Sequence, residues 1–208
     1  MTDNPGLKAA YALKTPDDSR ALYADWAESY DSDFVSNAQY ILHQAVAQAF
    51  VAASGSGPVL DMGAGTGVCG AALGQLGAGP IIGTDISPEM LEQAKTKGVY
   101  QELFVGDILA GLPVKDGLYA GVVSSGTFTS GHVGPDGLNE VLRVLRSGGL
   151  AVVSVRDDHF EKAGFAAKLS ELEPLLAKTH QTKTAIYDAS AEGPHAKEQA
   201  VLLHLWKA

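Results

Sequence analysis

From Gly57 onward the chain alternates short apolar runs, rich in β-branched residues, with longer segments whose apolar residues recur every three or four positions. The apolar runs cover residues 58–62, 80–85, 103–105, 121–124 and 150–155. Such alternation is typical of successive strand-helix-strand units, because parallel strands must be joined by a crossover that passes over a face of the sheet. We therefore predict an α/β fold with a mostly parallel sheet.

The two ends of the chain complete this prediction. Residues 1–56 carry two amphipathic helical stripes, expected to form an N-terminal helical cap and a first sheet-packing helix (Leu22, Trp26, Ala27 and Tyr30; then Leu42, Val46, Ala49 and Ala53). A helical stripe at residues 165, 169, 172 and 176 should be kinked or interrupted by Pro174. The last strand candidates, 184–187 and 200–206, lie too close together for a helical crossover, which favours an antiparallel C-terminal hairpin. The expected product is one domain over residues 1–208 with a seven-stranded sheet in a Rossmann-like three-layer sandwich, residues 57–208 forming its core.

Composition narrows the classes of partner. The formal net charge is −9 with no clustered basic patch, so we expect no nucleic-acid partner. No apolar stretch reaches membrane-spanning length and the first residues do not resemble a signal peptide, so we expect a cytoplasmic protein without a membrane partner, as a monomer or homodimer. Cys69 is the single cysteine, and the histidines show no metal-ligand spacing, so no disulfide and no metal are expected.

The segment 59–67 predicts a strand that runs into a glycine-rich turn and then a helix. Gly65, Gly67 and Gly70 have the G-x-G-x-x-G spacing of dinucleotide-binding loops, which alone decides little. Asp61 separates the alternatives, because a carboxylate is unfavourable beside a pyrophosphate and favourable beside a cationic ligand such as S-adenosylmethionine. The alternative is that Asp61 merely caps the following helix.

Two more carboxylates follow predicted strands. Asp85 ends the second strand, where an acidic side chain can accept both hydrogen bonds of a ribose diol. Asp107 ends the third strand, where it could reach the amino group of adenine; the alternative is a turn-forming Gly-Asp pair.

With these residues in place, the sequence resembles the class I S-adenosylmethionine-dependent methyltransferase family. The matching stretches are 60–67, 83–94, 106–107 and 142–149, with Ser147 at a position where the family usually has proline. The resemblance implies S-adenosylmethionine as the cofactor. It assigns the methionine portion to Asp61, Gly63, Ala64 and Gly65, the ribose to Asp85 with Ile86 and Met90, and adenine to Gly106, Asp107 and Ile108.

Residues 23–31 and 125–133 also look like the Williams-Beuren-region methyltransferase-like branch of that family. In related enzymes the Tyr-Asp pair after the cap helix lies over the cofactor, which nominates Tyr30, and Ser125 completes the predicted cofactor set. Trp26 is expected to belong to the apolar stripe of its helix.

A methyl group attached to a sulfonium is already activated, so alignment and desolvation can supply most of the rate. If the acceptor arrives protonated, His132 is the candidate general base, because it follows the fourth strand at the edge where ligands bind. Arg156, Asp157 and His159 follow the fifth strand and could touch the acceptor, although a solvated loop is the simpler interpretation.

The sequence thus predicts a methyltransferase that acts on an unidentified, small-molecule acceptor. The two alternatives are a non-catalytic domain that binds S-adenosylmethionine or S-adenosylhomocysteine, and a nicotinamide-dependent oxidoreductase.

Overall fold

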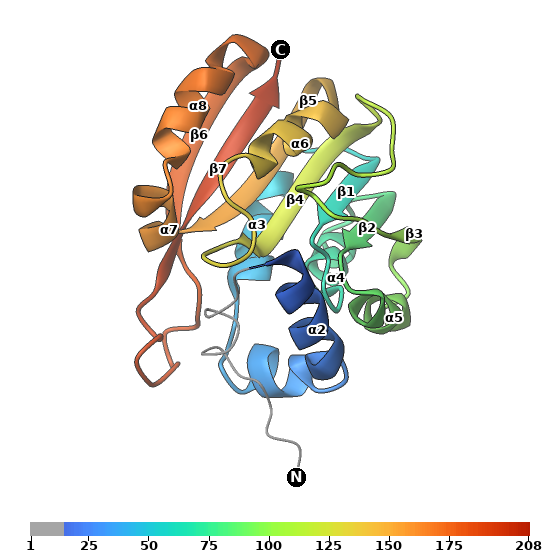
Figure 1. Ribbon diagram of the computed structural model, residues 1–208, viewed down its shortest axis with the longest axis vertical. Coiled ribbons are helices and arrows are strands. Elements are labelled where there is room, and N and C mark those ends of the chain that lie inside the picture. The colour runs from blue at the N-terminus through green and yellow to red at the C-terminus, as the bar shows by residue number, and fades with distance from the viewer. Residues whose placement is uncertain (1–14) are drawn as a thin grey trace.

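The computed structural model of the protein describes residues 15–208 and contains one seven-stranded sheet, with strand order β3-β2-β1-β4-β5-β7-β6 (Figure 1). Neighbouring strands from β3 to β5 pair in parallel, whereas β7 is antiparallel to both β5 and β6. The mostly parallel sheet with an antiparallel C-terminal hairpin is therefore confirmed. The strands are β1 (Val59–Met62), β2 (Ile81–Asp85), β3 (Tyr100–Val105), β4 (Tyr119–Phe128), β5 (Leu145–Arg156), β6 (Leu176–Ala185) and β7 (Gln199–Lys207).

The central strands are buried on both faces of the sheet, which explains why they read as continuous apolar runs. All four residues of β1 are buried, and Val59 is paired with Ile81 of β2 and with Gly121 of β4. Because these strands are parallel and are paired with little offset in register, their carboxyl ends meet along one edge of the sheet.

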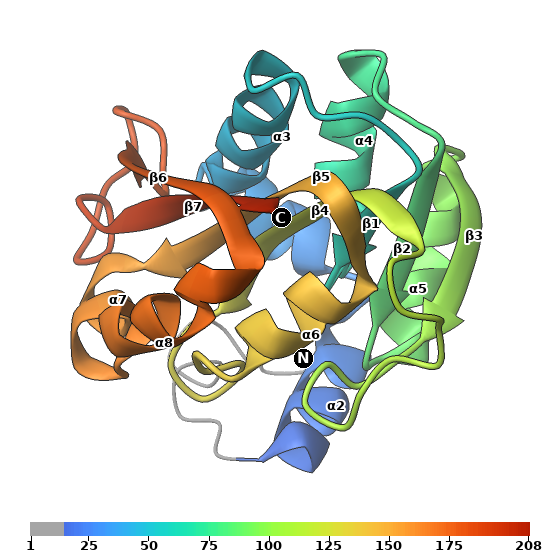
Figure 2. The ribbon, with the colours of Figure 1, turned by 90° about the horizontal axis from the view of Figure 1, so that it is seen from above.

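Helices cover both faces of the sheet (Figure 2). On one face lie α3 (Leu42–Ala52) and α4 (Val68–Gln75), and on the other lie α6 (Gly137–Val144), α7 (Asp157–Lys162) and α8 (Phe165–Leu172). Two apolar cores follow from this arrangement, the first built around Val46, Phe50 and Leu73 and the second around Leu138 and Phe165. Helix α5 (Pro88–Thr96) packs against β2 and β3.

The N-terminal cap differs from the predicted continuous helix. Helix α2 (Pro16–Trp26) begins at a capping box between Thr15 and Asp18 and ends at Trp26. A turn and then a π-helix, η1 (Asp31–Ser36), follow, so Tyr30 stands at the start of a second segment. The rings of Trp26 and Tyr30 still meet edge to face with centroids 4.9 Å apart, because Ala27 and Tyr30, at the two ends of the turn, keep right-handed helical backbone angles that bring residues four apart together. Residues 1–14 of the predicted cap lie outside the described residues.

The C-terminal elements confirm one prediction and correct another. Pro174 interrupts the helical stripe, as predicted: α8 stops at Leu172, and Pro174 lies in a 3₁₀ turn, η2 (Glu173–Leu175). Leu176, expected on the helix, opens β6, and the predicted strand 184–187 supplies only the last two residues of β6. The pattern concealed this strand because β6 is an exposed edge whose side chains mostly face solvent.

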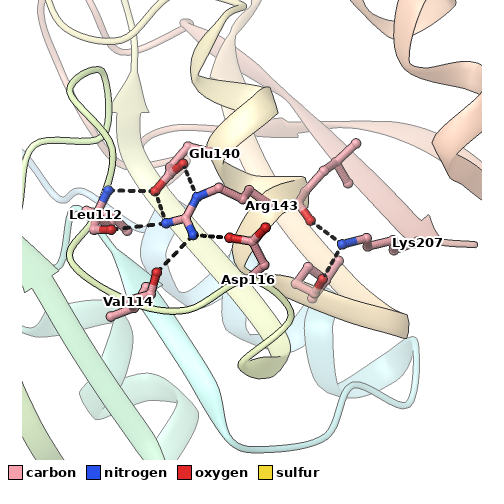
Figure 3. A network of polar contacts seen from close by, with 8 residues as sticks. Leu112, Val114, Asp116, Glu140, Arg143 and Lys207 are labelled. Atoms are coloured by element: carbon pink, nitrogen blue, oxygen red, sulfur yellow. Dashed lines mark hydrogen bonds and ion pairs between the residues drawn. The ribbon is translucent and has the colours of Figure 1, made fainter.

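The connection from β3 to β4 also departs from the predicted alternation, since residues 106–118 cross without a helix. Instead of helical hydrogen bonds within the connection, side chains of α6 form hydrogen bonds to its backbone (Figure 3). Arg143 donates to the carbonyls of Leu112 and Val114, and Glu140 accepts from the amide of Leu112 at 2.6 Å. Because Arg143 also pairs with Glu140 and Asp116, one guanidinium holds residues 112–116 of this connection next to α6.

Candidate active site

A cleft of about 1000 Å³, including its open mouth, lies at the carboxyl edge of the sheet under the N-terminal cap. Its volume suits a small-molecule or cofactor site. The structure brings together at this cleft all but one of the predicted cofactor residues (Tyr30, Gly63, Ala64, Gly65, Asp85, Ile86, Met90, Gly106, Asp107, Ile108 and Ser125), and the candidate base His132 as well.

Asp85 fastens the glycine loop to the end of β2. Its Oδ2 accepts from the amide of Gly65 at 2.8 Å, and its Oδ1 accepts from the amide of Ser87 at 3.0 Å. Each carboxylate oxygen has further lone pairs, so Asp85 can hold the loop and still accept from a ligand diol. Burial raises the pKa of Asp85, while the amides of Ser87, Gly65 and Ile86 lower it by stabilising the charged form.

Asp107 combines the two roles that the sequence left open. Its Oδ1 accepts from the amides of Leu109 and Ala110, as in a turn-forming aspartate. The side chain also lines the cleft, and its Oδ2 has no hydrogen bond to any described residue. One carboxylate oxygen therefore shapes the turn and the other is available to a ligand.

The glycines of the loop serve different purposes. Gly65 has φ +54° and a Cβ there would meet no atom within 4 Å, so its backbone needs glycine for its conformation and faces open space. At Gly70 a Cβ would lie 2.2 Å from the hydroxyl oxygen of Tyr100. The third glycine of the G-x-G-x-x-G pattern is therefore required by packing against Tyr100 and provides no support for a dinucleotide.

Asp61 is placed behind the cleft instead of at its wall. It is fully buried, accepts from the Tyr100 hydroxyl at 2.7 Å and is absent from the residues that line the cleft. No hydrogen bond joins it to Gly65 or Thr66, and the capping alternative is met instead by the amide of Gly70 in the first turn of α4, which interacts with the Asp61 carboxyl. Burial raises the pKa of Asp61 to about 7, although the Tyr100 hydroxyl and the Gly70 amide lower it. A direct contact between Asp61 and the cofactor is thus not supported, and any influence would act through the loop or through its charge.

The cap is fastened to the cleft through Asp31. One oxygen of this carboxylate accepts from the Thr66 hydroxyl in the glycine loop, and the other pairs with the ammonium of Lys97, just after α5. The sequence reasoning did not single out Asp31 for this role, because Thr66 and Lys97 are distant in the chain. The contacts hold Tyr30, the preceding residue, in the wall of the cleft.

His132 is paired with Tyr23 of the cap. The Tyr23 hydroxyl lies 2.9 Å from Nε2, and Nδ1 lies 3.3 Å from the carbonyl oxygen of Ser130. A carbonyl can only accept, so the hydrogen belongs on Nδ1, and Nε2 accepts from Tyr23. Burial lowers the pKa of His132, which keeps the imidazole neutral near pH 7. Tyr23 was not among the predicted site residues because only the cap's packing brings it to the loop after β4.

The three candidate residues after β5, namely Arg156, Asp157 and His159, lie in different surroundings. Asp157 pairs with Lys183 at the surface, and His159 lies within hydrogen-bond distance of Ser130 and the Val133 carbonyl, where it supports the loop that carries His132. Arg156 faces inward and lines a second cavity.

The second cavity, which we term the aromatic chamber, adjoins the cleft and has a volume of about 560 Å³. Tyr23, Tyr30, Tyr40, Gly126 and His132 belong to the walls of both spaces. Tyr40, also missed from the sequence, lies 3.1 Å from Ser125 through their hydroxyl oxygens. The other residues of the chamber are Trp26, Phe34, Leu42, Phe128, Thr129, Ser154, Arg156, Ile186 and Tyr187.

The residues of the cleft fit S-adenosylmethionine. The open Gly65 backbone, the Asp85 carboxylate and the unengaged Oδ2 of Asp107 offer a close approach, a diol acceptor and an acceptor for an amino group. Buried apolar contacts from Met90 and Ile108 would flank the nucleoside. This arrangement is that of an enzyme with a nucleoside cofactor.

Comparison with known proteins agrees with this class. Residues 59–149 match the family described as "Methyltransferase domain". The chain is 30% identical to human Methyltransferase-like protein 27 over 174 residues, which cover 80% of this chain and 71% of the relative. It is 26% identical to the demethylmenaquinone methyltransferase of Clavibacter sepedonicus over 200 residues, covering 93% of this chain and 81% of the relative.

Among solved structures, the fold is similar to a Thermotoga maritima protein described as an S-adenosylmethionine-dependent methyltransferase and possible histamine N-methyltransferase. The TM-score is 0.64 at 17% identity, covering 91% of this chain and 99% of that one. The chain belongs to the class I S-adenosylmethionine-dependent methyltransferase family. The enzyme class and cofactor are thereby established over the oxidoreductase and non-catalytic alternatives, while the narrower Williams-Beuren-region branch stays a prediction.

Two further findings concern the described residues. No helix among residues 15–208 is both long and apolar enough to cross a membrane. Within the same range, no group of three or more His, Cys, Asp and Glu side chains is placed to hold a metal ion.

Proposed function

We propose that the methyl acceptor is a small molecule that occupies the aromatic chamber, and that His132 accepts its proton. The observation that carries the proposal is the Tyr23–His132 hydrogen bond, located in the wall shared by the cofactor cleft and the chamber. A group at this wall can contact an acceptor on one side while the cofactor lies on the other. Both the demethylmenaquinone and the possible histamine methyltransferases are named for small-molecule acceptors, which supports the proposal.

S-adenosylmethionine supplies a methyl group on a positively charged sulfur. The residues of the chain provide alignment and proton removal. The acceptor gives its proton to the Tyr23 oxygen while the Tyr23 hydrogen passes to Nε2 of His132, so that the acceptor carries a full lone pair toward the methyl carbon. The neutral state of His132, caused by burial, leaves Nε2 able to take this proton.

Labelled methyl transfer from S-adenosylmethionine to a panel of small acceptors tests the proposal. We expect His132→Gln to lower kcat by about a hundred-fold or more, which is the usual contribution of a general base, with the dissociation constant of S-adenosylhomocysteine unchanged. His180→Gln is the matched control, because His180 is exposed on β6 and lines neither cavity. An unchanged kcat in His132→Gln would refute the assigned role of His132, and transfer to none of the acceptors would oppose a small-molecule substrate.

A further inference from the structure

The aromatic chamber has a polar character opposite to that of the cofactor cleft. Asp85 and Asp107 line the cleft, whereas no carboxylate lines the chamber among the described residues. The charged side chain of the chamber is Arg156, with 17% of its side chain exposed. Two hydrogen bonds to Asp158 and the nearby Glu198 carboxylate, 3.9 Å away, compensate the charge of Arg156, whose guanidinium carries only N–H donors and no acceptor.

Trp26 adds a second donor. Only 3% of this residue is exposed, and its Nε1 is a buried nitrogen without a hydrogen-bond partner among the described residues. An indole N–H can donate but never accept, and leaving it unpaired in a buried position is costly. The Oγ1 of Thr129, another chamber residue, is also buried and without a partner in the described part of the chain. The Trp26 N–H needs an oxygen or nitrogen lone pair from whatever fills the chamber, whereas the Thr129 hydroxyl can either donate to it or accept from it.

The walls of the chamber require a flat, apolar body. Seven Phe, Tyr and Trp rings line it, and the Phe34 ring packs near three of the others, with ring centroids 5.1 Å from Tyr30, 4.8 Å from Tyr40 and 6.4 Å from Tyr187. Aromatic faces alone would suit either another ring or an ammonium ion. The Trp26 N–H decides between these two, because an ammonium ion cannot accept its hydrogen bond and would leave this buried donor unpaired.

We infer that the acceptor is a hydroxylated aromatic compound, neutral or anionic, that is methylated on oxygen in the aromatic chamber. This inference rests on the proposed function. The acceptor oxygen accepts hydrogen bonds from the chamber and forms the new bond to the methyl carbon. The carbon–sulfur bond breaks with its electron pair going to sulfur, and the hydroxyl proton passes through Tyr23 to His132. The products are the aromatic methyl ether, S-adenosylhomocysteine and one proton, later released to water.

Calorimetric titration of the protein saturated with S-adenosylhomocysteine tests the inference with three matched probes, namely 4-nitrophenol, nitrobenzene and 4-nitrobenzylamine. We expect 4-nitrophenol to bind at least ten-fold more tightly than nitrobenzene, which lacks the hydroxyl group, or than the cationic amine. Equal or tighter binding of the amine would overturn the inference.

The variant Trp26→Phe keeps an aromatic ring and removes the N–H donor. We expect it to weaken 4-nitrophenol binding by roughly ten-fold, as is typical for the loss of one hydrogen bond, while the melting temperature and S-adenosylhomocysteine affinity are retained. Trp206→Phe is the control, since Trp206 lies outside the chamber, and Thr129→Val tests the second unpaired group independently. Unchanged 4-nitrophenol affinity in both chamber variants would overturn the inference.

Labelled methyl transfer separates this inference from the proposed function. Methylation of 4-nitrophenol supports both. If amines are methylated and phenols neither bind nor react, the acceptor class is wrong but a small-molecule methyltransferase remains. If no small molecule is methylated although S-adenosylhomocysteine binds, the proposed function fails, and the inference fails with it.

Discussion

Replacing Asp61 with asparagine should make the stability of this enzyme less dependent on pH. The Asp61 carboxyl is fully buried under the glycine loop, and burial raises its pKa from 3.8 to about 7. The unfolded chain keeps the ordinary value, so the folded state binds the extra proton between these two pKa values. The stabilising contribution of protonated Asp61 is therefore present at low pH and is lost as the pH rises through about 7.

The magnitude follows from the difference between the two pKa values. One pKa unit corresponds to about 1.4 kcal/mol, so the gap between 3.8 and about 7 is worth at most ~4 kcal/mol. Asparagine has no proton to lose, and its amide has nearly the shape of the protonated carboxyl. We expect Asp61→Asn to match the wild type near pH 4 and to exceed its free energy of unfolding by up to ~4 kcal/mol near pH 8.5.

Urea unfolding at several pH values between these limits, followed by circular dichroism, measures this difference. Asp25→Asn makes the same chemical change at an exposed position of α2 and should leave the pH dependence unaltered. The reasoning would be refuted if Asp61→Asn and wild type differed by a constant amount at every pH, or if the variant were less stable at the alkaline end.

Two further changes test the cofactor cleft and the loop between β3 and β4. Asp85→Asn should weaken S-adenosylmethionine binding by roughly ten-fold or more, measured by calorimetry, because it removes a charged acceptor that also orients the Gly65 amide; unchanged affinity would count against the proposed cofactor position. Arg143→Met should lower the free energy of unfolding by about 2–4 kcal/mol, because it leaves the Glu140 carboxylate, whose side chain is 10% exposed, without its cation. The exposed Arg146 provides the control, since Arg146→Met should change the urea midpoint little, and equal effects of the two substitutions would contradict the role given to Arg143.

The alternation of apolar runs and helical stripes was sufficient to predict the sheet because β1, β2, β4 and β5 are buried on both faces. Burial on both faces leaves a continuous apolar run that sequence reasoning detects. The exposed edge strand β6 leaves no such run, and the β3–β4 connection gains its order from Arg143 instead of from a helix. Both features were missed because partners distant in sequence provide the stabilising contacts.

The sequence by itself determined which residues follow the parallel strands. Strand ends in a parallel sheet meet at one edge, so the sequence was sufficient to predict that Asp85 and Asp107 lie together at the cleft. It could not determine the direction of each side chain. Asp61 also lies at a strand end, yet it points into the layer beneath the loop, where Tyr100 of a non-adjacent strand supplies its partner. Only the tertiary structure assembled the aromatic chamber, because packing of the cap on the sheet joins Tyr23 and Trp26 to Tyr187, far along the chain.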